Sequence, residues 1–563
     1  MNQNLSYRTK TCRLLLSTSL LFFITLHVTA QPSWVKKASK SVFTLKTFAA
    51  DGSLLSSTNG FYTGTNGEAV SNFTPFKGAS SAIIIDAQGK EFPVSSILGA
   101  NDMYDVVRFR VNASKTQPLA LSNAITPEGS MAWLLPYRET KSIASGLIRK
   151  AETFQGYAYY TVAMTLPQHA ESCPLMNDEG EVIGMMQPSA QVGDTLSYAL
   201  SAVFADSLRM TGLTMFDQSL QQTQIRKELP DDLQEANLAV FMAGSRNDSA
   251  QYAAIVEDFI QKFPDTPDGY IYRAQIETAA NKFAEAENDM NQALRVSKQK
   301  EETHFTYARM IYQKELYQST PYEGWSLDMA LSEIREAIKQ NPQPTYRQLE
   351  ADILFAQKQY DEAYKIYQQL SLGELRSAEV FFSAARCKEM LRDTTTMLAL
   401  MDSVMATFSR PYLKEAAPYL WARADARRQA GKYREAINDM NDYEELMKAS
   451  VNDNFYYVRH QTEIQGRLYQ QALNDISKAI QMNPQEVLYY AEKASLEIRV
   501  GLYDDAMSTA HECIAIDDQN SDGYLFLGLA QCMKGQKQEG LQNLQRALKL
   551  GDPQAEDLMK RFQ

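Results

Sequence analysis

The sequence has few residues that break regular structure and few cysteines. It contains 26 glycines and 19 prolines among 563 residues, about 8% together, against about 12% in average proteins. A chain made only of short strands and many turns is therefore disfavoured, and long helices are expected. Hydrophobic residues make up 44% and charged residues 22%, which excludes disordered and collagen-like classes. Five cysteines without a ladder of pairs exclude a disulfide scaffold.

Positive charge is also scarce. The formal net charge is −12, and no run of basic residues occurs. Residues 31–212 hold 14 basic and 15 acidic residues, and residues 213–563 carry a net charge of −14. The two parts therefore differ in character. Because contacts to phosphate need clustered lysine and arginine, the sequence predicts no nucleic-acid partner.

The N-terminus has the pattern of an export signal. Arg8, Lys10 and Arg13 precede an apolar stretch over residues 14–28, which ends at a small-residue cleavage site before Gln31. The stretch is short for a bilayer span, and no other run approaches 18 apolar residues. We expect residues 1–30 to be a cleaved signal peptide. The mature protein is then exported, to the periplasm or the medium, with no membrane span.

A period of 34 residues runs through the C-terminal two-thirds of the chain. Tyr490, Ala494, Ala506 and Cys513 recur 34 residues later, as the following equivalents: Tyr524, Gly528, Gly540 and Ala547. An aromatic residue, two polar residues and a small residue open the second half of earlier units, at 433–436, 360–363 and 283–286. Small residues at such positions let paired helices approach closely, and large apolar residues fill the space between units.

This pattern resembles the tetratricopeptide repeat family, whose units are helix–turn–helix pairs. About eight pairs are expected over residues 236–563, with an insertion of roughly ten residues near 313–325. Such arrays bind protein or peptide partners in a concave groove lined by the first helix of each pair. By register the groove positions are the aromatic residues Phe305, Phe382, Trp421 and Tyr457. Intramolecular packing is the alternative role for these rings. Cys513 and Cys532 fall on neighbouring helices, and whether they pair is left open.

Residues 36–205 alternate short apolar runs with turns rich in glycine, asparagine and aspartate. Examples of the runs are residues 81–86, 91–94, 106–111 and 181–186. Short strands at this spacing predict a β-barrel or a β-sandwich. A polar connector over residues 213–235 separates this part from the repeats. The expected domains are the signal peptide, a β domain over 31–212, the linker and the repeat array.

Three segments of the β domain, in chain order, resemble the trypsin-like fold of the bacterial high-temperature-requirement proteases. They are residues 60–74, 103–109 and 169–177. They are similar to the family's strand–turn–strand before the catalytic histidine, its Asp-Leu-Ala-Val-Leu segment and its Gly-Asn-Ser-Gly-Gly-Pro-Leu-Val-Asn loop. Residues 197–201 are similar to the strand that closes the substrate cleft. The resemblance implies an all-β double barrel, so the expected protein is a trypsin-like double barrel followed by an all-α tetratricopeptide solenoid.

The resemblance carries over only one member of the catalytic triad. The aspartate matches Asp105, but the histidine position falls on Thr74 and the serine position on Glu171. The glycine that supplies an oxyanion-hole amide falls on His169. Threonine is no base at neutral pH, and a glutamate at the nucleophile position places negative charge where negative charge must be stabilised.

A shift of one residue makes Ser172 the fallback nucleophile. It still needs a base, and among the five histidines only His169 lies in the mature β domain. His169 is three residues before Ser172 on the same loop, and the base of a triad comes from the opposite barrel. The sequence therefore predicts no catalytic residue, no metal and no cofactor. It favours a non-catalytic scaffold of the cell envelope that binds proteins or peptides, and the alternative is a trypsin-like endopeptidase with a non-standard catalytic group.

Overall fold

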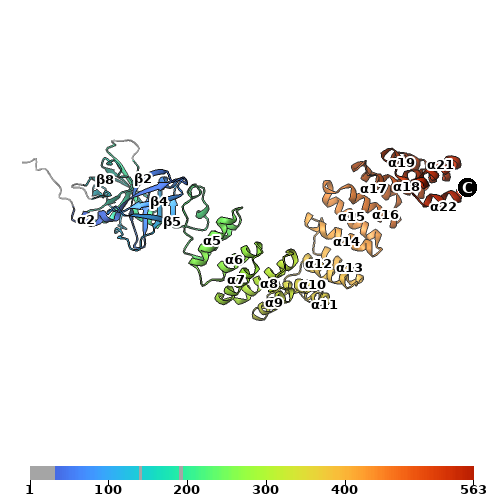
Figure 1. Ribbon diagram of the computed structural model, residues 1–563, viewed down its shortest axis with the longest axis horizontal. Helices are drawn as coiled ribbons and strands as arrows, with labels where there is room; N and C mark the ends of the chain where they lie inside the picture. The colour runs from blue at the N-terminus through green and yellow to red at the C-terminus, as the bar shows by residue number, and fades with distance from the viewer. Residues whose placement is uncertain (1–31, 139–142, 189–193, 563) are drawn as a thin grey trace, which may run out of the picture. The chain divides into compact units, whose positions relative to one another are not determined.

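The computed structural model describes residues 32–138, 143–188 and 194–562. The predicted signal peptide lies outside these residues. Contacts divide the chain into two compact units, residues 1–280 and 281–563, and each is described by itself. The first unit contains the strands and the first helices, and the second contains only helices (Figure 1).

The first unit contains two closed barrels of six strands. The first barrel comprises β1 (Val42–Phe48), β2 (Leu54–Tyr62), β3 (Glu68–Ser71), β4 (Ser81–Ile85), β5 (Glu91–Asn101) and β6 (Val106–Val111). The second comprises β7 (Met131–Leu134), β8 (Ser145–Phe154), β9 (Tyr157–Ala163), β10 (Pro174–Met176), β11 (Val182–Met186) and β12 (Ser197–Ser201). The strand orders are β1-β2-β3-β6-β5-β4 and β7-β8-β9-β12-β11-β10, so the two barrels share one antiparallel topology.

The barrels form because their strands alternate between apolar and polar residues. Along β9, Ala158, Tyr160 and Val162 are buried, and the residues between them are partly exposed. This period of two places one row of side chains inside a closed sheet. The double barrel expected from the trypsin-like resemblance is confirmed, as are the strands expected near residues 81–86 and 106–111.

The segment after the second barrel packs against the first barrel. The sequence predicts a polar connector over 213–235, but the structure buries five of its apolar residues at 2–8% exposure. They are Met215, Phe216, Leu220, Ile225 and Leu229. The polar glutamines between them face outward. The backbone of residues 226–228 also bonds β5: Ile97 N donates to Arg226 O at 2.8 Å, and Glu228 N donates to Ile97 O at 2.9 Å. The apolar side chains of the segment are thus part of the core of the first barrel. The boundaries expected at residues 212 and 236 remain a prediction.

Helices make up the rest of the chain. Those of the first unit are α2 (Val35–Ala38), α3 (Ala202–Ser207), α4 (Leu233–Gly244), α5 (Ser249–Lys262) and α6 (Pro267–Ala279). Those of the second unit are α7 (Phe283–Val296), α8 (Lys300–Tyr317), α9 (Leu327–Gln340), α10 (Pro344–Ala356), α11 (Tyr360–Leu370), α12 (Ala378–Met390), α13 (Thr394–Met405), α14 (Ala417–Gln429), α15 (Tyr433–Met447), α16 (Asp453–Gln465), α17 (Tyr469–Met482), α18 (Val487–Arg499), α19 (Tyr503–Ile516), α20 (Ser521–Lys534), α21 (Lys537–Lys549) and α22 (Gln554–Phe562). The expected all-α solenoid is confirmed.

Small residues set the spacing within the helical pairs. In the pair α20–α21, a Cβ added at Gly528 would lie 2.8 Å from the carbonyl oxygen of Gly540, closer than non-bonded atoms can approach. One pair earlier, the equivalent residues Ala494 and Ala506 are fully buried. The 34-residue recurrence of small residues therefore reflects close contact between paired helices.

The expected insertion is a loop between α8 and α9. The loop places Trp325 in the core, where the side chain is 3% exposed. Its indole N–H donates to the Tyr307 hydroxyl at 3.2 Å. The ring also packs against Phe283, with 5.7 Å between centroids. The inserted residues are thereby fixed to the hairpin that contains them.

Candidate functional site

A network of polar side chains lies where the two barrels meet. Asp105, directly before β6, accepts a hydrogen bond from the backbone N–H of Thr74 at 2.6 Å. Thr74 begins a short 3-10 helix after β3, and its side chain is exposed. The structure therefore brings together the two positions that the resemblance assigns to the aspartate and the histidine, and a threonine stands at the second.

Asn72 links this pair to the opposite barrel. Its side-chain amide donates to Asp105 Oδ2 at 2.9 Å and to the Asp105 carbonyl at 3.0 Å. Its Oδ1 accepts a hydrogen bond from the hydroxyl of Ser172. An amide thus connects a carboxylate to a serine hydroxyl, a place that a histidine fills in a hydrolytic triad. An amide cannot accept the serine proton, so this arrangement orients the hydroxyl without activating it.

The fallback nucleophile Ser172 is enclosed. It is 0% exposed, and among the described residues its hydroxyl has two side-chain partners, Asn72 and Thr58, the latter at 3.3 Å. Its own backbone N–H donates to Met186 O at 3.0 Å. A nucleophile has to reach a bound carbonyl carbon. A fully buried serine whose hydroxyl already bonds an amide does not meet this requirement.

The loop that contains Ser172 keeps an unusual backbone. His169 and Ser172 have φ of 60° and 61°, in the left-handed region that favours glycine. Both are positions at which the resemblance implies glycines. The loop is held from the first barrel by Asn59, whose amide donates to His169 O at 2.5 Å and to Glu171 O at 3.4 Å. The side chains of His169 and Glu171 are exposed.

Cysteines offer no reactive group in the described residues. Cys173 follows Ser172 and is 1% exposed, and burial raises the pKa of its thiol to about 12. Burial also raises the pKa of Cys387 to about 12 and that of Cys513 to about 11. Since the thiolate is the reactive form, these thiols are inert at neutral pH. Cys513 and Cys532 are free and do not form a disulfide.

The four predicted groove aromatics are each partly exposed and each contact another ring. Phe305 stacks on Tyr346 of the next first helix at 4.8 Å, and Phe382 meets Tyr419 edge-on at 5.4 Å. Trp421 packs 5.9 Å from Phe455, and Tyr457 lies 5.2 Å from Tyr489. The rings therefore contribute to packing between successive hairpins while keeping an open edge.

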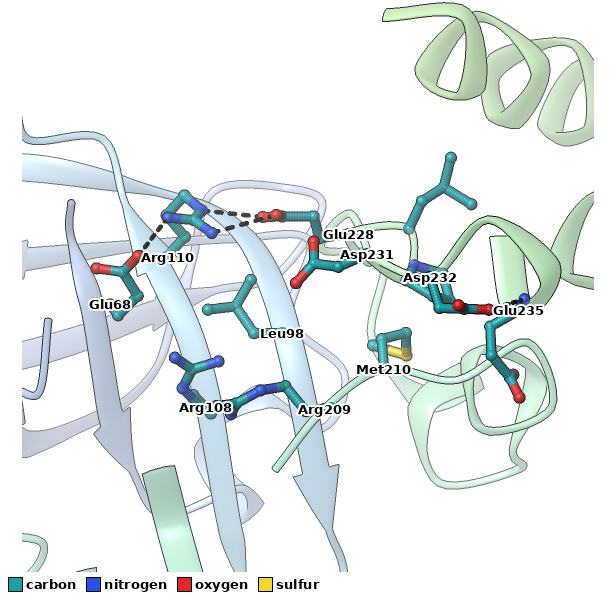
Figure 2. A pocket seen from close by; sticks show the side chains of 12 residues that line it. Glu68, Leu98, Arg108, Arg110, Arg209, Met210, Glu228, Asp231, Asp232 and Glu235 are labelled. Carbon is teal, nitrogen blue, oxygen red and sulfur yellow. Dashed lines mark hydrogen bonds and ion pairs between the residues drawn. The ribbon is translucent and has the colours of Figure 1, made fainter. Parts of the chain in front are cut away.

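A cavity of about 370 Å³ lies beside the first barrel, between β5, β6 and the packed connector (Figure 2). Arg110 projects into it and bonds Glu68 Oε1 at 2.9 Å and Glu228 Oε2 at 2.9 Å. Backbone N–H groups and then Arg110 hold the pKa of Glu68 below its ordinary value against the effect of burial, and for Glu228 the bond from Arg110 is the main cause that lowers the pKa. Sequence reasoning did not identify this cluster, since its members are far apart along the chain. Because its charges satisfy one another, the cluster anchors the connector.

No group of three or more histidine, cysteine, aspartate or glutamate side chains is arranged to hold a metal ion among the described residues. Within the same residues no helix has the length and apolar character needed to cross a bilayer.

Comparisons with known proteins find relatives of the repeats. No family model matches the chain. Over 93 residues the chain is 32% identical to Small glutamine-rich tetratricopeptide repeat-containing protein 2 of Saccharomyces cerevisiae. The aligned residues cover 16% of this chain and 27% of that protein. Over 122 residues it is 26% identical to DnaJ homolog subfamily C member 7 of Homo sapiens, covering 22% and 23% respectively. The chain thus spans about a quarter of the length of these curated relatives.

Among solved structures, an inactive form of Rv3671c from M. tuberculosis H37Rv is similar to 32% of this chain and 89% of that chain. The identity is 17% and the TM-score is 0.27. At the level of architecture, the protein combines two closed six-stranded β-barrels with a helical array, and part of the chain is similar to proteins that are named for tetratricopeptide repeats.

Proposed function

We propose that the protein is a non-catalytic scaffold that binds polypeptide partners through its helical repeats. The single observation that supports the non-catalytic part most strongly is the Asp105–Asn72–Ser172 chain, in which an amide takes the place of a base. The curated relatives are named for tetratricopeptide repeats or as a DnaJ homolog, and repeat arrays of this kind present extended binding surfaces.

The proposal includes export. The basic and apolar residues at the N-terminus support a cleaved signal, and the protein would then act in the cell envelope, in the periplasm or outside the cell. The barrels would serve as a pseudoprotease, a protease fold that keeps its architecture without the reaction.

One preparation of the chain from residue 31 tests both parts. Casein cleavage and labelling by a fluorophosphonate serine probe are measured beside the variant Ser172→Ala. We expect wild type and variant to be indistinguishable from a blank. Cleavage or labelling that disappears in Ser172→Ala would overturn the pseudoprotease assignment.

The binding part is tested by cross-linking the same chain to proteins of an envelope extract and mapping the cross-linked lysines. We expect the cross-links to fall on lysines within residues 300–560. Cross-links confined to the barrels, or none above a denatured control, would overturn binding through the repeats.

A further inference from the structure

A cavity of about 380 Å³ opens in the helical array between α12, α13 and α14. Its floor is apolar and consists largely of Met397 and Met401, which are 7% and 5% exposed. Ala422 and Ala426 of α14 line the side opposite α12. Methionine is flexible and polarisable, so a methionine floor adapts to apolar side chains of different shape.

Phe382 forms one wall of the cavity. It is one of the four aromatic residues that the repeat register predicts for the groove, and it alone among them lines this cavity. One edge of its ring is held against Tyr419, and the side chain remains partly exposed. The cavity therefore has a fixed aromatic wall beside an adaptable floor.

The rim of the cavity holds four charged side chains, two arginines and two carboxylates. Arg386 and Arg392 are exposed, and neither has a carboxylate partner among the described residues, although Arg386 lies over the Phe355 ring at 5.0 Å. The rim carboxylate Asp425 is already bonded by Arg428 at 2.7 Å. Glu389 is the remaining rim carboxylate.

Two neighbouring charges leave the charge of the rim unchanged. Lys388 lies 3.6 Å from Asp393, the residue that caps α13, so these two charges oppose each other. With Asp425 bonded by Arg428, the two arginines and Glu389 remain on the rim as the charges that a partner would meet.

We propose that this cavity takes one large apolar side chain of a polypeptide partner, and that a carboxylate beside that side chain pairs with Arg386 or Arg392. The inference rests on the proposed function and names the chemistry of the partner. A partner segment with basic residues at the same place would face two unpaired arginines. An apolar anchor in a central pocket with charged groups at the rim is a common division of roles in protein recognition.

The test begins with random 12-residue peptides displayed on phage and selected on the full chain from residue 31. A selected peptide is then synthesised, and its Kd is measured by fluorescence anisotropy for wild type and variants. We expect selected peptides to share one leucine, methionine or phenylalanine next to an aspartate or glutamate. We also expect the affinity to fall as salt is raised, because exposed charge pairs are screened.

Two variants separate shape from charge. Ala422→Phe fills the cavity, and Arg392→Glu reverses one rim charge; each is expected to weaken binding by about tenfold or more. Arg467→Glu is the matched control, since Arg467 is exposed at an equivalent turn outside the cavity and, like Arg392, has a positive φ. It should change the Kd by less than about twofold. Thermal melts confirm that each variant is folded.

Several outcomes would overturn the inference. They are selection of no peptide, selection of basic peptides, peptides unaffected by both cavity variants, and binding that requires a second copy of the chain. Each leaves the proposed function standing if cross-linking still finds a partner on the repeats, so failure of the inference and failure of the proposed function are distinguishable.

Discussion

The barrel interface and the interiors of the helical hairpins bury polar groups in different ways. Between the barrels the partners are mostly neutral, with Asn72, Thr58 and Ser172 bonded around the carboxylate of Asp105. Inside α16–α17 the partners are charged, and Arg459 bonds both oxygens of Asp475 at 2.6 and 3.1 Å. A neutral network stabilises an interface without providing a group that moves protons. A charged pair holds a hairpin together only while both members are present.

The largest effect is expected on replacing one member of that charged pair. Arg459→Leu removes both bonds from Arg459 to Asp475, which is 4% exposed, and leaves Lys478 at 3.9 Å as its nearest cation. The variant should lower the free energy of unfolding by about 3–5 kcal/mol. Urea denaturation followed by circular dichroism measures the change.

The chain provides a matched control for this variant. The residues 68 positions after Arg459 and Asp475 are Leu527 and Asn543, which form the equivalent pair in α20–α21. The double variant Arg459→Leu, Asp475→Asn copies that pair and should recover most of the loss. If the double variant is as unstable as the single one, buried charge pairing is not what stabilises this hairpin.

A second effect concerns Glu463, which lies one turn after Arg459 and is 3% exposed, with its Oε2 unpaired. Burial raises the pKa of Glu463 to about 8, with Asp475 and Glu444 adding to the rise and Arg459 and Lys478 opposing it. The folded state therefore holds a proton that the unfolded chain releases near pH 4.3. Its contribution to stability is complete below that pH and is lost as the pH rises to about 8.

Glu463→Gln removes this dependence. The variant copies Gln531, the residue at the same place in α20, which accepts a bond from Asn543 at 2.8 Å. Between pH 5 and pH 8 the free energy of unfolding of wild type should fall relative to the variant, by up to about 1.4 kcal/mol per pH unit. Parallel curves for the two proteins over this range would contradict the assignment.

A smaller effect is expected at the barrel interface. Asn72→Leu leaves Asp105 Oδ2 and the Ser172 hydroxyl without the amide, and should cost about 1–3 kcal/mol in urea denaturation. Asn123→Leu, at an exposed asparagine of the same domain, is the control and should be nearly neutral. Equal effects would show that the network does not hold the barrels together.

The smallest effect is expected in the turns of the array. Lys358 lies between α10 and α11 with φ of 64°, where Gly431, Gly501 and Gly535 stand in equivalent turns. Lys358→Gly should raise the free energy of unfolding by about 1 kcal/mol, because glycine adopts this conformation without strain. Lys365→Gly, inside α11, should destabilise by a similar amount. A loss of stability in Lys358→Gly would show that the lysine side chain outweighs the strain.

The repeats could be predicted in detail because their information is local and periodic. The recurrence of Ala494 as Gly528 and of Ala506 as Gly540 follows from one contact repeated every 34 residues. The barrels could be predicted as a class, since alternating strands are visible in the sequence. These signals depend on neighbours within a few tens of residues.

The role of Asn72 could not be predicted, because its partners lie 33 and 100 residues away and no period relates them. The signal that was present is a polar residue inside the apolar segment before Thr74. The packing of the connector could not be predicted for a related reason. Its glutamines suggest a solvated linker, but Phe216 and Leu220 face a core whose other residues come from a distant segment of the chain.

The connector also determines how tension passes through the first unit. Covalently, a pull from the C-terminal side would reach the second barrel, from which the chain leaves after β12 (Ser197–Ser201). Residues 226–228 are bonded to Ile97, and Glu228 pairs with Arg110. Because these bonds come first along the chain, such a pull acts on the first barrel before it reaches the second. The contact between the two barrels is therefore protected from such a pull until these bonds break.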